Sequence, residues 1–139
     1  MWITIFLLLL FSIGQYRNIT HPKEPRLTRV DIANQTDLEN KMIVDDNALI
    51  ELQKVWENVL WEQSKRNMAR VEDVDIQLFY EYKTDFPENI ENYKIWFSVN
   101  GSTEIINPIE HTYVKLDGEK AKKLKNILLH KTVKKTATP

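Results

Sequence analysis

Hydrophobic residues form one unbroken run at the start of the chain and then recur with two different spacings further along it. Residues 2–13 hold only two polar side chains, Thr4 and Ser12. In several later segments apolar and polar residues alternate, which is typical of a half-buried strand. In two others apolar residues recur every three or four positions, which is typical of a helix with one apolar face. The pattern predicts a hydrophobic N-terminal segment followed by an α+β domain.

Two helices are predicted from the longer spacing. The clearer one covers residues 46–63, with Asp45 among the candidates to cap its first turn. Its apolar stripe consists of Leu49, Leu52, Val55, Trp56, Val59 and Leu60. The second helix follows Asp117, another candidate cap, and its stripe consists of Ala121, Leu124, Ile127 and Leu128.

The strands are predicted from strict alternation and from turn residues between the runs. The clearest strand is residues 74–82, and its period of two indicates an antiparallel sheet with one face buried. The others are predicted at residues 27–32, 41–44, 93–99, 103–106 and 111–116. The fold class is therefore α+β, a small antiparallel sheet of about four or five strands packed with two helices. The expected order is β-(β)-α-β-β-β-β-α.

A hairpin is predicted where Asn100-Gly101 separates two strands. A two-residue turn would place Phe97 opposite Glu104. A three-residue loop with Gly101 in the left-handed conformation would instead place Phe97 opposite Thr103 and align the apolar faces better. We therefore expect the second register.

The N-terminal run is short for a membrane span. As a helix it is roughly 18 Å long, against about 30 Å for the hydrocarbon core of a bilayer. We expect residues 1–16 to be a signal peptide or a membrane anchor, residues 17–26 a polar linker, residues 27–130 a single α+β domain and residues 131–139 a basic disordered tail. Export with the segment retained, cleavage near Gly14 and a domain facing the cytoplasm all remain open alternatives.

Charge is distributed unevenly along the chain. Residues 31–119 hold 19 of the 20 acidic residues and only 8 of the 19 basic ones, although the net charge of the whole chain is −1. An acidic centre repels phosphate backbones, so nucleic acid is not expected as a partner.

Catalytic motifs are missing from the sequence. The chain has no cysteine, three histidines and three glycines, which excludes thiol nucleophiles and glycine-rich phosphate loops. The residues considered for metal-assisted catalysis are Asp73, Asp75 and His111, provided that they meet in one cleft. No catalytic, cofactor-binding or metal-binding residue and no cofactor is predicted from the motifs themselves.

The first hypothesis for function combines the N-terminal segment with the missing motifs. It is a membrane-tethered or exported non-enzymatic domain that binds a protein or a component of the bacterial cell envelope. Residues 2–16 would contact the membrane and the domain would be extracytoplasmic. Trp96, Phe79 and Ile106 would form the contact surface if the helices cover only the other side of the sheet. The alternatives are a metal-assisted enzyme using Asp73, Asp75 or His111, and a structural subunit of a membrane complex.

Overall fold

The computed structural model describes residues 25–34, 40–82, 88–130 and 133–134 of the 139. The predicted hydrophobic segment at 1–16 therefore lies outside the described residues. So do residues 17–24 of the predicted linker and most of the predicted tail.

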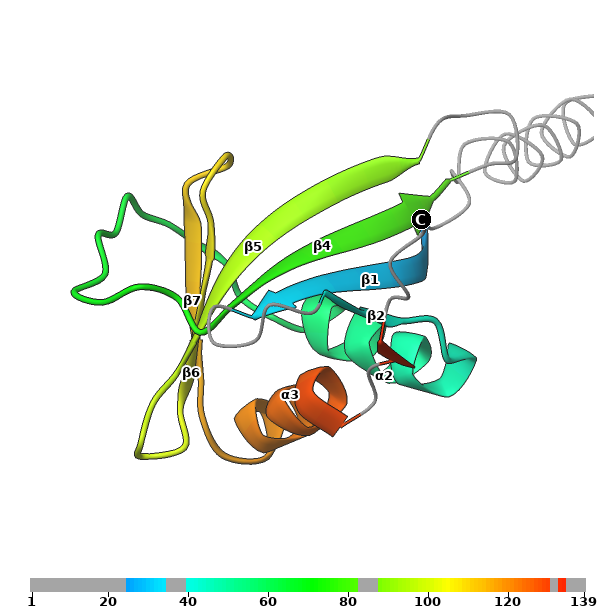
Figure 1. Ribbon diagram of the computed structural model, residues 1–139. Coiled ribbons are helices and arrows are strands. Elements are labelled where there is room, and N and C mark those ends of the chain that lie inside the picture. The colour runs from blue at the N-terminus through cyan, green and yellow to red at the C-terminus, as the bar shows by residue number, and fades with distance from the viewer. Residues whose placement is uncertain (1–24, 35–39, 83–87, 131–132, 135–139) are drawn as a thin grey trace, which may run out of the picture.

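Two helices and eight strands make up the described part of the chain (Figure 1). The helices are α2 (Asp46–Glu57) and α3 (Gly118–His130). The strands are β1 (Arg26–Asn34), β2 (Lys41–Ile43), β3 (Glu62–Gln63), β4 (Val74–Glu81), β5 (Asn89–Phe97), β6 (Thr103–Asn107), β7 (Thr112–Leu116) and β8 (Val133–Lys134).

The strands form one sheet in the order β3-β7-β6-β5-β4-β1-β2-β8, and all described pairings are antiparallel. This confirms the predicted fold class, an antiparallel sheet packed with two helices. The sheet is larger than the predicted four or five strands. All six segments predicted as strands form strands, and β3 and β8, with two residues each, come in addition to them. A strand that short has no alternation for a sequence pattern to detect.

Both helices lie against one face of the curved sheet, and the main apolar core fills the space between them (Figure 1). Alternate residues of β1, β4 and β5 enter this core, including Val30, Ile76 and Ile95, each at most 1% exposed. The predicted helix stripes supply the other side, with Leu52 and Leu124 fully buried. Burying these side chains is the main source of stability for a domain of this size.

Helix α2 begins where predicted and ends earlier. The Asp45 carboxylate accepts a hydrogen bond of 2.9 Å from the backbone N–H of Ala48, which caps the first turn. Asn58 leaves the helical conformation, and its side chain donates to the carbonyl of Lys54. The prediction that the helix continues to residue 63 is therefore wrong, and Leu60 is 92% exposed instead of buried.

The hairpin between β5 and β6 has the expected register. Phe97 lies opposite Thr103, and Ile95 lies opposite Ile105. Gly101 has φ +88°, a left-handed conformation that glycine adopts without steric cost. The three-residue loop is confirmed.

Candidate functional site

The face of the sheet turned away from α2 and α3, here called the outer face, is covered over only part of its area. Residues 64–72, the covering segment, cross it above β5, β6 and β7. Met68 packs on Trp96, Ile106 and Tyr113, and the indole N–H of Trp96 donates to the carbonyl of Arg70 at 2.9 Å.

The three side chains of the predicted contact surface are buried. Trp96 is 4% exposed and Ile106 is 6% exposed, because the covering segment lies on both. Phe79 is 6% exposed, and the guanidinium of Arg29 lies 3.9 Å from the centre of its ring. The prediction that these three side chains form an exposed binding surface is wrong.

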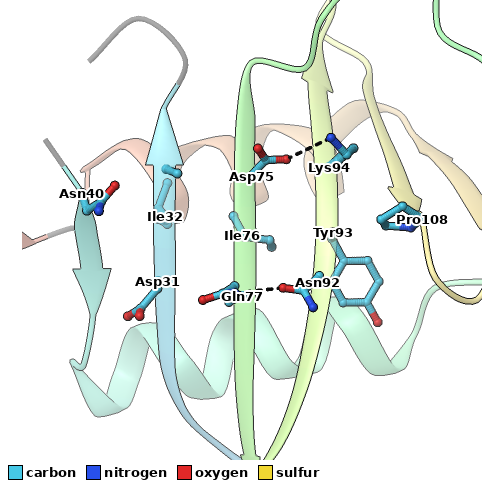
Figure 2. Close-up of a pocket in the computed structure, with 11 residues that line it drawn as sticks. Asp31, Ile32, Asn40, Asp75, Ile76, Gln77, Asn92, Tyr93, Lys94 and Pro108 are labelled. Carbon is cyan, nitrogen blue, oxygen red and sulfur yellow. Dashed lines mark hydrogen bonds and ion pairs between the residues drawn. The ribbon is translucent and has the colours of Figure 1, made fainter. Parts of the chain in front are cut away.

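Beyond the covering segment, the outer face holds a pocket of about 480 Å³, called here the polar pocket. It lies over β1, β4 and β5. Figure 2 shows Asp75, Gln77, Asn92 and Lys94 on the side of these strands away from α2, whereas Ile76 and Tyr93, which also border the pocket, belong to the apolar core on the helix side. Its lining includes Asp31, Asn40, Asp75, Gln77, Asn92, Lys94 and Pro108. A concave site of this volume on a rigid sheet is a candidate for binding a small molecule.

Lys94 is the centre of the charged part of this site. Its ammonium lies 2.8 Å from Oε1 of Glu72 and 3.8 Å from Oδ1 of Asp75. Asp75 and Lys94 are directly paired in the register of β4 and β5, whereas Glu72 comes from the end of the covering segment. The side chains of Lys94 and Asp75 are 40% and 39% exposed, and that of Glu72 is 12% exposed.

The electrostatics give these groups different roles. The hydrogen bond from Lys94 holds the pKa of Glu72 below its ordinary value. The same bond, together with the charges of Asp75 and Glu72, raises the pKa of Lys94 against the opposing effect of burial. Lys94 is therefore a permanent cation at neutral pH, suited to binding an anion and unsuited to acting as an amine nucleophile.

Two amides form the neighbouring part of the floor. The Gln77 side chain donates to Oδ1 of Asn92 at 3.1 Å, across the pairing of β4 with β5 (Figure 2). Asp31, on β1, is paired with Gln77 of β4, and the Asp31 carboxylate is 3.1 Å from Nε of Arg29. The pocket therefore offers polar groups of several kinds to a ligand.

The three residues considered for metal-assisted catalysis are not brought together. The Asp73 carboxylate accepts two hydrogen bonds from Arg70, at 2.8 and 2.9 Å, and one from the backbone N–H of Phe97. The contact with Arg70 is the main reason that the pKa of Asp73 is lowered. Asp75 lines the polar pocket, whereas His111 lies in the β6–β7 turn with φ +55° and lines a different pocket.

Metal binding receives no support from the part of the chain that the structure describes. There, no group of three or more His, Cys, Asp or Glu side chains is arranged to hold an ion. Asp73 has a structural role, since it fixes Arg70 and the end of β5. Of the three candidates, Asp75 alone belongs to the polar pocket.

The sequence analysis did not identify Lys94 as a site residue. A signal was present, because Lys94 lies between Tyr93 and Ile95, two core residues of β5 that point to the other face. Its partner Glu72 is 22 positions away along the chain, so the ion pair depends on tertiary structure.

Comparison with known proteins gives a structural relative. Neither a protein-family model nor a curated protein sequence matches the chain. Among solved structures, it resembles a thioesterase-like protein from Clostridium sporogenes, with a TM-score of 0.59 and 15% sequence identity. The superposition covers 76% of this chain and 96% of that protein. At this identity the likeness establishes the fold.

This finding corrects the predicted function. The hypothesis of a non-enzymatic, membrane-tethered or exported domain is wrong, because the described domain shares its fold with a thioesterase-like protein. No helix among the described residues is long and apolar enough to cross a membrane. The same finding corrects three related expectations. These are the location at the cell membrane, the alternative of secretion after cleavage near Gly14, and the alternative of a structural subunit of a membrane complex. The proposed membrane contact at residues 2–16 lies outside the described residues.

Proposed function

We propose that this chain hydrolyses a small acyl thioester or ester in the polar pocket. The observation that carries the proposal is the position of the Lys94 ammonium beside the Asp75 carboxylate, at the wall of an open pocket. The thioesterase-like fold of a protein that is 15% identical supports the choice of reaction.

The proposed reaction divides the chemistry between two side chains. Asp75 accepts a proton from a water molecule, whose oxygen attacks the acyl carbon. The carbonyl oxygen gains negative charge and is stabilised by N–H donors of Lys94. When the carbonyl re-forms, the C–S bond breaks and the departing sulfur takes the proton from Asp75. The products are a carboxylic acid and a thiol.

Asp75 is a better candidate than Glu72 for the base. The Glu72 side chain is 12% exposed and its carboxylate is engaged by Lys94 at 2.8 Å, which stabilises its charge and makes it a weaker base. Asp75 is 39% exposed and its oxygen is further from the ammonium, at 3.8 Å. In this division of roles, Glu72 positions Lys94 and Asp75 contacts the water.

The pocket also restricts the acyl group. Carboxylate, amide and ammonium groups from residues such as Asp75, Gln77 and Lys94 line part of it, and its volume is about 480 Å³. A long hydrocarbon chain would leave these polar groups without hydrogen-bonding partners, which is energetically costly. We therefore expect short or polar acyl groups to be preferred.

Thiol release is a direct assay for this reaction. Because the chain contains no cysteine, a thiol-reactive chromophore reports only the product, with no background from the protein. The full chain is incubated with thioesters whose acyl groups range from acetyl to long alkyl, and with the matching oxygen esters. Turnover of short or polar substrates supports the proposal. Absence of turnover across the whole panel contradicts it.

Two variants connect the activity to the pocket. Lys94→Gln keeps a hydrogen-bond donor but removes the charge, and is expected to lower kcat about a hundredfold. Asp75→Asn is expected to lower it by about the same factor or more. Asp117→Asn is the matched control, because Asp117 is exposed and lies outside the pocket. Equal loss in all three variants would place the reaction elsewhere.

A further inference from the structure

A second pocket, of about 420 Å³, lies next to the polar pocket beneath the covering segment. Its lining includes Lys65, Arg66, Arg70, Lys94, a single carboxylate, Glu72, and His111. It is called here the basic pocket. Its excess of positive charge contrasts with the acidic composition of the surrounding chain, in which residues 31–119 hold 19 of the 20 acidic residues.

Two of these cations are already neutralised. Arg70 makes its paired hydrogen bonds with Asp73, and Lys94 binds Glu72. Lys65 and Arg66 form no ion pair with any residue that the structure describes. The excess charge of the basic pocket therefore comes from these two side chains.

Arg66 is also held in a defined place. Its guanidinium lies 3.9 Å from the centre of the Tyr113 ring. The Tyr113 hydroxyl donates to Glu104 at 2.6 Å, and burial together with this bond raises the pKa of Tyr113 to about 12. The ring stays neutral at physiological pH and supports the guanidinium. A planar group fixed in this way loses little side-chain entropy when it binds an oxyanion.

We propose that the basic pocket binds the phosphate group of a small molecule. Arg66 would supply paired N–H donors to two phosphate oxygens, and Lys65 a second positive charge. A compact anion can reach a local positive site within an acidic domain, whereas the acidic surroundings repel an extended polyanion. A small phosphorylated ligand therefore fits these observations better than a nucleic acid.

The position of the basic pocket suggests how such a ligand lies. Lys94 and Pro108 line both pockets, so a molecule anchored by its phosphate in one can extend into the other. If the polar pocket is the hydrolytic site, its substrate carries a phosphate on the part that extends into the basic pocket. This last step rests on the proposed function, whereas phosphate binding itself does not.

Binding is measured with inorganic phosphate and pyrophosphate, by following the indole N–H signal of Trp96 in nuclear magnetic resonance spectra of the full chain. Trp96 lines the basic pocket and donates to the carbonyl of Arg70, so its signal is a local reporter. We expect both anions to shift this signal in a saturable way. Pyrophosphate is expected to bind more tightly because of its higher charge.

Charge-removing variants test which side chains are responsible. Arg66→Gln is expected to weaken pyrophosphate binding about tenfold, and Lys65→Gln less, since hydrogen bonds between charged groups are the strongest in the site. Both side chains are exposed, so neither substitution should disturb folding. Lys123→Gln, at an exposed position of α3, removes the same charge outside the pocket and should leave affinity unchanged.

Three results would overturn the inference. They are no saturable shift with either anion, an equal loss of affinity in Lys123→Gln, or tighter binding of malonate or of a single-stranded oligonucleotide than of pyrophosphate. Phosphate binding without thioester turnover would contradict only the proposed function. Turnover without phosphate binding would contradict only this inference.

Discussion

The two faces of the sheet are built from the same strands but meet different demands. The face under α2 and α3 is apolar along β1, β4 and β5, and its side chains are almost completely buried. On the outer face, the same three strands present Asp31, Asp75, Gln77 and Lys94 to the polar pocket. Packing determines the residues of the first face, whereas the second is free to carry chemistry. We therefore place the function on the outer face.

The largest expected effect is on stability and comes from the buried face. Ile76 and Gln77 are neighbours on β4 and point to opposite faces of the sheet. Ile76→Ala should destabilise the domain by about 2–5 kcal/mol, because it leaves a cavity in the core at a residue that is 1% exposed. Gln77→Ala should cost less than about 1 kcal/mol, since it removes one hydrogen bond with Asn92. Denaturant unfolding measures both, and similar losses would contradict the contrast between the faces.

A smaller effect is expected where the outer face is covered. Trp96→Phe keeps an aromatic ring but removes the hydrogen bond to the carbonyl of Arg70, and should cost about 1–2 kcal/mol. The covering segment should also loosen. Hydrogen exchange should become faster at the amide of Ser64, which donates to the carbonyl of His111, and stay unchanged at Val30 in the core sheet. Unchanged exchange at Ser64 would mean that Trp96 does not hold the segment.

The smallest effect concerns the ion pair at the polar pocket. The pKa of Glu72 is lowered in the folded protein, so its stabilisation is present above its ordinary pKa of 4.5 and is lost as pH falls through the lowered value. The pKa of Lys94 is raised in the folded protein, so the stabilisation from its ammonium is fully present below its ordinary pKa of 10.5. This stabilisation is lost as pH rises through the raised value. Glu72→Gln should therefore cost less than about 1 kcal/mol at pH 7, because Lys94 is partly exposed.

The difference between the native chain and Glu72→Gln should become smaller in acid, and thermal unfolding at pH 7 and pH 3 measures it. Glu119→Gln, on the exposed surface of α3, is the matched control. A difference that persists unchanged at pH 3 would show that the carboxylate charge is not its source.

The buried face could be predicted from the sequence because burial leaves a periodic pattern. The alternation along residues 74–82 predicts β4, and the side chains that it assigns to the core include Ile76 and Leu78, both buried. Asp45 marks the start of α2, and Gly101 sets the hairpin register. Each of these signals is local, lying within a few residues of the feature that it determines.

The outer face could not be predicted in the same way. The covering segment is polar and has no period, and it is held by isolated long-range contacts such as Met68 on Trp96. The Lys94–Glu72 pair needs the register of β4 with β5 and the path of the covering segment together. Asp75 was recognised as a candidate from its carboxylate, but its companions in the sequence hypothesis, Asp73 and His111, lie outside the polar pocket.

The measurement that tests the central claim most directly is kcat/KM for thiol release from a short-chain thioester, compared between the native chain, Asp75→Asn and Asp117→Asn. We predict a loss of about a hundredfold or more in Asp75→Asn and native activity in Asp117→Asn, with all three proteins equally folded. Native activity in Asp75→Asn would contradict the assignment of catalysis to the polar pocket on the outer face.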